Sequence, residues 1–224
     1  MIEKYLRTGI RFKWNKPLDG ATVRDGQFVD STQAATNLVY DGLDGKLGLA
    51  MGLTHPSSLG LTMGMKITYD WLDYAPGRIA KKALSGNDVL TGSMTGCIIA
   101  VWTDTGRKFV GHVGTISSEQ DTNSKVKSHF ATAMAIDKDA KGFDPFAAWP
   151  TGEIVSLSIK LSPVVPKQHI FALVTNENKF YSILMLELPR TPGRPMTDPV
   201  EWCSGGIKEV NPTNCSQIAK LTGA

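Results

Sequence analysis

Two apolar runs separated by a turn signal set the strongest constraint on the fold of this chain. Residues 97–103 read Cys-Ile-Ile-Ala-Val-Trp-Thr, and residues 107–113 read Arg-Lys-Phe-Val-Gly-His-Val. Both runs are rich in the β-branched and aromatic side chains that favour strands. The segment Asp104-Thr105-Gly106 between them is typical of a tight turn. The sequence therefore predicts an antiparallel β-hairpin.

Further strands are expected in the C-terminal part of the chain. Residues 154–161, 168–175 and 179–188 are apolar runs of strand length. The segment Asn176-Glu177-Asn178 joins the last two as a second hairpin.

One longer helix is expected after the first hairpin. Residues 117–120 read Ser-Ser-Glu-Gln, which matches a capping box at a helix start. Val126, Phe130 and Met134 follow at four-residue spacing and give this helix an apolar stripe.

The N-terminal part carries weaker patterns. Residues 22–29 suggest a short hairpin around Asp25-Gly26, and residues 32–40 suggest a short helix capped by Ser31. The Gly-rich segment 42–64 is expected to mix loop with short strands, and it holds no phosphate-binding glycine motif.

These elements together predict one α+β domain over residues 1–224: a largely antiparallel, two-layer sheet with helices at its sides. The chain holds 22 Gly and 12 Pro, an excess that agrees with many turns and many strands. A domain of 224 residues can bury about 70% of its unfolded surface. It therefore needs no metal or disulfide to fold.

Composition excludes several classes of function. The net charge is only +3, and no block of five like charges occurs, so nucleic acid and membrane surfaces are not expected partners. No apolar stretch is long enough to span a membrane, and the first residues lack the apolar core of a signal peptide. We expect a cytoplasmic protein, or one secreted without a classical signal that acts in the cytosol of a target cell.

The chain holds three cysteines, at positions 97, 203 and 215. Their odd number and wide spacing form neither a disulfide framework nor a zinc pair, and reduced thiols are expected. A bond between Cys203 and Cys215 is not excluded by the sequence. No pair of histidines has zinc spacing, and His169 is expected to be a structural residue of its strand.

The predicted hairpin brings a cysteine and a histidine together. Cys97 follows a loop of small residues, and His112 lies on the returning strand. A loop of two residues that pairs Thr103 with Gly106 places Cys97 directly opposite His112, with Cβ atoms ~4.5–5.5 Å apart. A four-residue loop gives the same pairing. A three-residue loop places the two side chains on opposite faces.

Such a pair suits nucleophilic catalysis. An imidazolium beside a thiol lowers the pKa of the thiol, and the same histidine can protonate a leaving group and activate water. Backbone N–H groups at Thr95 and Gly96 are candidates for an oxyanion hole. The hydroxyl of Thr91 is a candidate for orienting the imidazole, as the third member of a triad does.

The same residues resemble a known family. Met94-Thr95-Gly96-Cys97 resembles the Leu-Ser-Gly-Cys motif of the toxin glutamine deamidases, such as cytotoxic necrotizing factor and the Burkholderia lethal factor. A threonine six residues before the cysteine and a histidine fifteen after it also resemble the chemotaxis-receptor deamidase. Thr91, Cys97 and His112 occupy these places. The match covers about 25 of the 224 residues, and Met94 and Thr95 depart conservatively from the motif.

The resemblance implies a mixed β-sandwich flanked by helices, and hydrolysis of a glutamine side-chain amide on a target protein without a cofactor. We expect the target to be a folded protein and the enzyme to be a monomer. It also implies a single deamidase-like catalytic domain of toxin or effector type. The same dyad would serve a transglutaminase or a thiol protease. A third possibility is a binding or structural protein in which Cys97 is a core residue, because a lone cysteine on an apolar strand usually has that role.

Overall fold

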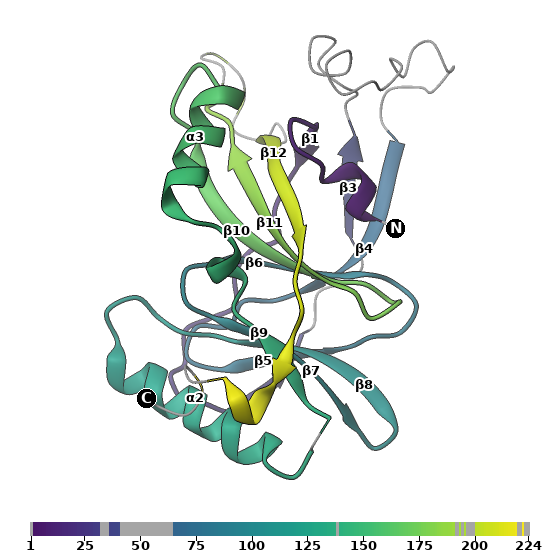
Figure 1. The fold of residues 1–224 in the computed structure, drawn as a ribbon, viewed down its shortest axis with the longest axis vertical. Helices are drawn as coiled ribbons and strands as arrows, with labels where there is room; N and C mark the ends of the chain where they lie inside the picture. Colours follow the sequence, from purple (N-terminus) through teal and green to yellow (C-terminus); the bar gives the residue numbers. More distant parts are fainter. Residues whose placement is uncertain are drawn as a thin grey trace.

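The computed structural model of the chain describes residues 2–31, 36–40, 65–137, 139–190 and 200–218, with the single residues 193, 195 and 221. Within these residues the fold is α+β, with two largely antiparallel β-sheets packed together (Figure 1). The predicted fold class is therefore confirmed. One of the two sheets is not an open sandwich layer, because its strands close into a barrel.

The barrel consists of seven strands. In spatial order they are β1 (Arg11–Trp14), β12 (Val200–Glu209), β11 (Phe180–Glu187), β10 (Lys167–Val174), β6 (Val89–Met94), β4 (Met65–Leu72) and β3 (Thr36–Tyr40). Pairing of β3 with β1 closes the barrel, and only the β4–β6 pair among these contacts is parallel. Large aromatic side chains fill the interior, including Trp14, Trp71, Phe171 and Trp202. Such a filled interior is normal for a barrel of this size.

The second sheet has six strands. Their order is β13 (Thr213–Asn214), β9 (Lys141–Phe143), β7 (Ile98–Asp104), β8 (Arg107–Val113), β5 (Ile79–Ala83) and β2 (Phe28–Asp30). Helix α2 (Gln120–Met134) covers the face of this sheet that points away from the barrel (Figure 1). Val126 and Phe130 are buried there and Met134 packs beside them, so the predicted apolar stripe is confirmed.

The remaining helices lie at the edges of this arrangement. Helix α3 (Thr151–Leu161) packs beside β12 and contributes Ile154 and Leu161 to the core between the two sheets. Short 3-10 helices cover residues Ile2–Tyr5 (η1), Pro145–Ala148 (η3) and Cys215–Gln217 (η4).

The alternation of each strand sends its side chains into separate cores. On β7, Ile99 and Val101 point into the core between the sheets, whereas Ile98 and Ala100 point towards α2. Cys97 belongs to the core between the sheets. The candidate nucleophile therefore lies at the junction of the barrel and the second sheet.

The hairpins of the sequence analysis are present. Strands β7 and β8 form the first, and β10 pairs with β11 across the turn at residues 175–179 to form the second. The predicted capping box, however, is not made, because the N-cap of α2 is Glu119 and its side chain makes no cap hydrogen bond. Instead, the Asn123 amide accepts from the N–H of Ile116 (2.7 Å) and donates to its carbonyl (2.8 Å).

Three predicted elements are wrong. Residues 154–161 are helical, because the buried positions Ile154, Ser158 and Leu161 follow the helical period although the β-branched residues there favour a strand. Residues 36–40 form strand β3 rather than a helix. No hairpin forms over residues 22–29, since β2 pairs in parallel with β5. Residues 42–64 lie outside the described part of the chain.

Candidate functional site

Cys97 is held in a small cluster of hydroxyl groups. Its side chain is 2% exposed, and its Sγ lies 3.3 Å from Oγ1 of Thr115, the second residue after β8. The carbonyl of Thr115 accepts a hydrogen bond of 2.5 Å from the Tyr74 hydroxyl. Burial raises the pKa of the Cys97 thiol, and hydrogen bonds from Thr115 and from the backbone of Gly96 offset only part of this rise.

The register of the β7–β8 hairpin differs from the prediction. Asp104 pairs with Arg107 across the two-residue turn Thr105-Gly106, so His112 lies opposite Ile99 and not opposite Cys97. Thr105 and Gly106 both have positive φ (48° and 76°), as a type I′ turn requires, and this fixes the pairing.

The displacement amounts to two residues, which leaves the side-chain parity intact. His112 shares a face with Ile99, and Cys97 packs in the same core as Ile99. Continuing the register by one residue makes Cys97 and His112 diagonal neighbours, a relation with ~7–8 Å between the residues.

His112 is fixed from the opposite sheet. Its Nδ1 lies 2.7 Å from the Oγ1 of Thr91 on β6, so this hydrogen bond joins the second sheet to the barrel. The ring is fully buried, and its Nε2 has no hydrogen-bond partner among the described residues. Burial, with a smaller effect from Lys16, lowers the pKa of His112 to about 3. The imidazole is therefore neutral at pH 7.

Tyr74 connects the histidine to the cysteine. Its ring lies against His112, with centroids 5.2 Å apart. Burial, together with the nearby Cys97, raises the pKa of Tyr74 to about 12, so the phenol keeps its proton and can donate. Thr91, His112, Tyr74, Thr115 and Cys97 thus form one continuous group, which we call the inter-sheet cluster.

Sequence reasoning missed Tyr74 and Thr115. Tyr74 lies just after β4, and no spacing relates it to Cys97. Thr115 is the second residue after β8, so the register of the hairpin, once known, places it near Cys97. Of the two predicted backbone donors, Gly96 has a hydrogen bond with the thiol, whereas the side chain of Thr95 is exposed.

The expected thiolate–imidazolium pair is not present in this structure. The pKa of Cys97 is raised and that of His112 is lowered, both chiefly by burial. The resting state is therefore a neutral thiol and a neutral imidazole.

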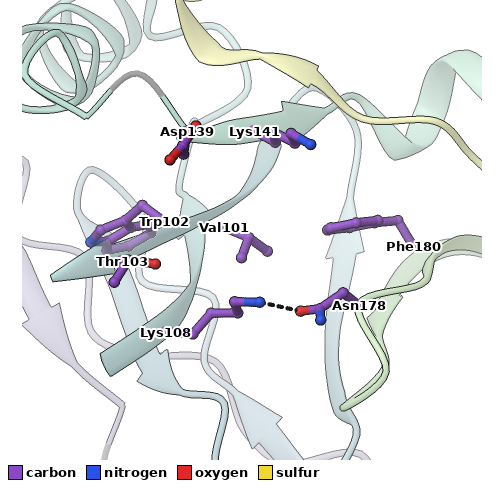
Figure 2. A pocket seen from close by; sticks show the side chains of 8 residues that line it. All are labelled: Val101, Trp102, Thr103, Lys108, Asp139, Lys141, Asn178 and Phe180. Carbon is purple, nitrogen blue, oxygen red and sulfur yellow. Dashed lines mark hydrogen bonds between the residues drawn. The ribbon is translucent and has the colours of Figure 1, made fainter. Parts of the chain in front are cut away.

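Surface pockets lie elsewhere. The pocket in Figure 2, of about 310 Å³, lies near the tip of the β7–β8 hairpin and is lined by Trp102, Lys108 and Phe180 among others. Two further pockets, of about 640 Å³ and 360 Å³, are lined by residues that include Met134 and Asp144 respectively. None of these three pockets is lined by a residue of the inter-sheet cluster.

Metal ligands, the other thiols and the helices are the remaining features that the sequence raises. Among the described residues, no three His, Cys, Asp or Glu side chains lie close enough to hold a metal ion. Cys203 and Cys215 are buried free thiols, as expected. No described helix is long and apolar enough to cross a membrane.

Comparison of the chain with models of known protein families, with curated proteins and with solved structures finds no match.

Proposed function

We propose that this protein is a cysteine-dependent protein-glutamine deamidase, with Cys97 as nucleophile and His112 as general base. The observation that carries the proposal is the hydrogen bond between His112 Nδ1 and Thr91 Oγ1 on the face that Cys97 shares. With Nδ1–H donating to Thr91, the lone pair of Nε2 remains for a proton. The resemblance of residues 94–97 to the toxin deamidases, and of the spacing of Thr91, Cys97 and His112 to the chemotaxis-receptor deamidase, supports the same roles.

The neutral resting state sets the order of the proton transfers. Sγ of Cys97 attacks the carboxamide carbon of the glutamine while its proton passes to Nε2 of His112. The imidazolium returns this proton to the nitrogen that leaves as ammonia. Water then attacks the thioester carbonyl and gives its proton to His112, and the thiol and a glutamate side chain are released. The backbone at Gly96 is the candidate donor to the oxyanion.

The burial of Cys97 adds a requirement. At 2% exposure Sγ is reached by a glutamine carboxamide only after the surrounding loops separate. The small residues before Cys97 offer little area for binding a free amino acid. We therefore assign the substrate to a folded target protein, whose docking supplies the binding energy for this opening.

One observation favours a second candidate. Cys97 is as buried as a core residue and has a raised pKa, which is the environment of an inert structural thiol. In that case the protein is a non-catalytic binding or structural protein, and the inter-sheet cluster holds the two sheets together.

Alkylation separates the two candidates. The native protein is treated with iodoacetamide at pH 6, alone and with a candidate target protein, and each cysteine is followed by peptide mass. Because docking of the target opens the site, the deamidase predicts that the target makes Cys97 react well before Cys203 and Cys215, which are also buried, and that His112→Gln removes this preference. Equal protection of all three thiols would favour the structural protein.

The product identifies the reaction. Intact-mass analysis of a candidate target should show amide-to-acid conversion with release of ammonia. Incorporation of an added amine would indicate a transglutaminase, and cleavage of the target chain would indicate a thiol protease.

A further inference from the structure

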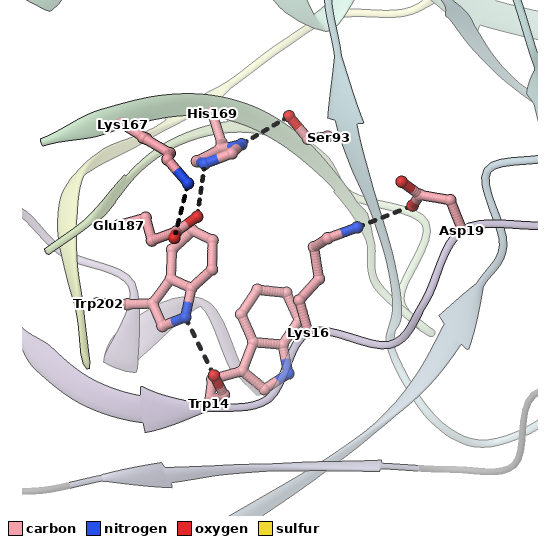
Figure 3. A network of polar contacts seen from close by, with 8 residues as sticks. All are labelled: Trp14, Lys16, Asp19, Ser93, Lys167, His169, Glu187 and Trp202. Atoms are coloured by element: carbon pink, nitrogen blue, oxygen red, sulfur yellow. Dashed lines mark hydrogen bonds and ion pairs between the residues drawn. The ribbon is translucent and has the colours of Figure 1, made fainter. Parts of the chain in front are cut away.

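A second histidine lies at the mouth of the barrel between a serine and a glutamate (Figure 3). Nδ1 of His169 is 2.9 Å from the Oγ of Ser93, and its Nε2 is 3.2 Å from an Oε2 of Glu187. None of these three residues belongs to the inter-sheet cluster. It also exceeds the structural role that the sequence alone suggests for His169.

The hydrogen-bond chemistry fixes the tautomer. Glu187 accepts from Nε2–H, so the lone pair of His169 lies on Nδ1 and accepts from the Ser93 hydroxyl. A hydroxyl that donates to an imidazole, which in turn donates to a carboxylate, is the arrangement of nucleophile, base and orienting acid. In the serine proteases Nε2 of the histidine faces the serine and Nδ1 faces the carboxylate, whereas in this protein Nδ1 faces Ser93 and Nε2 faces Glu187.

The fold explains why these three residues meet. Glu187 pairs with Lys167 across β10 and β11, which makes it the diagonal neighbour of His169 on the same face. The register between β10 and β6 shifts between Ile170 and Phe171, and such irregularities redirect side chains near functional sites. Ser93 is the residue of β6 that this shift leaves unpaired, between Gly92 and Met94, and it lies beside the strand that carries His169.

The ring of His169 is held from below as well. It packs against Trp202 and Phe171, with centroid distances of 5.2 Å and 6.2 Å. Its side chain is nevertheless 19% exposed and that of Glu187 is 26% exposed. The base is thus positioned rigidly and is open to solvent at the same time.

The barrel below this mouth holds unused hydrogen-bond donors. The indole N–H groups of Trp14 and Trp71 are buried and have no partner among the described residues. Figure 3 shows the Trp14 ring between Trp202 and Lys16, and the Trp202 ring packs against both Trp14 and His169. Lys16 pairs with Asp19 at 2.8 Å and lies over the Trp71 ring. Because aromatic side chains fill the barrel and these donors lie among them, a substrate can bind only at the open mouth and has to be small.

We propose that Ser93, His169 and Glu187 form a second nucleophilic site that hydrolyses small carboxylic esters. Ser93 Oγ attacks the ester carbonyl carbon while its proton passes to Nδ1 of His169. The bond to the alcohol oxygen breaks, and the alcohol leaves with that proton. Water then attacks the acyl-serine and gives a proton to His169, which releases the carboxylic acid and restores Ser93.

The test combines a covalent probe with a simple ester. A fluorophosphonate should label Ser93, as located by peptide mass, and the protein should hydrolyse p-nitrophenyl acetate. Ser93→Ala should abolish the label, and both Ser93→Ala and His169→Gln should slow the hydrolysis by about 100-fold or more. Cys97→Ser should leave the label on Ser93 in place, which keeps this site distinct from the proposed deamidase.

Two controls protect the interpretation. Ser128→Ala removes an exposed hydroxyl on α2 and should keep the label and the rate. Thermal unfolding of the Ser93→Ala variant checks that it is folded. Absence of the label at Ser93 in the wild-type protein would overturn the proposal, and so would hydrolysis that survives Ser93→Ala or a Ser93 label that is lost in Cys97→Ser.

Glu187→Gln tests the positioning role separately. The charged groups that act on His169 are Glu187, which raises its pKa, and Lys16 and Lys167, which lower it below the level set by burial. Loss of the carboxylate should therefore move the acid limb of the pH–rate profile to lower pH as well as reduce the rate. An unchanged profile would show that Glu187 does not act on the base.

Discussion

The Thr91 hydroxyl and the His112 imidazole form a 2.7 Å hydrogen bond between two different sheets. Thr91 is 1% exposed and His112 is fully buried, so no solvent competes for this contact. The orientation of His112 is therefore set by how the barrel and the second sheet pack together. Any change at Thr91 affects both the stability of that junction and the position of the proposed base.

Thr91→Val should lower the free energy of unfolding by about 1–3 kcal/mol. The substitution keeps the shape but leaves Nδ1 of His112 buried without a partner, as Nε2 already is. Thr91→Ser is the matched control, because it keeps the hydroxyl. Urea unfolding measures the difference. In a deamidation assay the Val variant should also be slower, by ~10–100-fold on the scale of lost positioning partners. A Val variant as stable as the Ser variant would contradict the structural role.

The stability of the protein should fall in mild acid because of His112. Its pKa is about 3 in the folded protein, against an ordinary value of 6.5, since burial disfavours the charged ring. Between these values the unfolded chain binds a proton that the folded chain does not. The stability is thus lost progressively as the pH falls from about 6.5 towards 3, at about 1.4 kcal/mol per pH unit for this one group.

His112→Gln isolates this effect. The variant lacks the titrating ring, so its free energy of unfolding should depend less steeply on pH over that range than that of the wild type. Urea unfolding at several pH values gives both slopes. Parallel slopes would show that His112 is not a buried neutral group.

If Cys97 and His112 act as one catalytic unit, their substitutions should not be additive. Cys97→Ser and His112→Ala should each remove nearly all deamidation, and the double variant should be little worse than either single variant. The rates are compared on one folded target, with circular dichroism as the check of folding. Near-wild-type turnover by either single variant would refute the dyad.

The elements that the sequence predicts well are those whose pattern is local. The β7–β8 and β10–β11 hairpins carry turn residues between apolar runs, and α2 carries a stripe at helical spacing. The sequence wrongly predicts a strand at α3, because Ile154 and Val155 have strand propensity, whereas burial of Ile154, Ser158 and Leu161 follows the helical period once the helix packs on the core.

At both candidate sites, the sequence indicates residues that are close along the chain but not those that tertiary pairing brings together. The spacing of Thr91, Cys97 and His112 is visible in the sequence, and the parity of the hairpin holds even though its register is displaced by two residues. Tyr74 joins this cluster through a loop, and no local pattern indicates it. Ser93 and His169 meet because β6 pairs with β10, a strand far away in the sequence, and because Ser93 lies within the register shift of that pair.

Alanine at two glycines should have opposite effects on stability, because one glycine lies on a tightly packed strand and the other on the exposed side of a helix. Gly111 precedes His112 on β8, and an added Cβ would lie 2.4 Å from Cζ3 of Trp102. Trp102 is 6% exposed and packs against Phe109 and Phe130, so its ring has little room to move.

Gly111→Ala should therefore lower the free energy of unfolding by about 1–3 kcal/mol through overpacking. Gly152 on α3 is the control, because a Cβ there meets no atom within 4 Å. Gly152→Ala should raise stability by about 0.4–1 kcal/mol, since alanine restricts the unfolded chain more than glycine does. Urea unfolding followed by tryptophan fluorescence gives both values. If Gly111→Ala is as stable as the wild type, Trp102 does not lie against β8 in the way this structure describes, and the face that presents His112 to the barrel has to be redrawn.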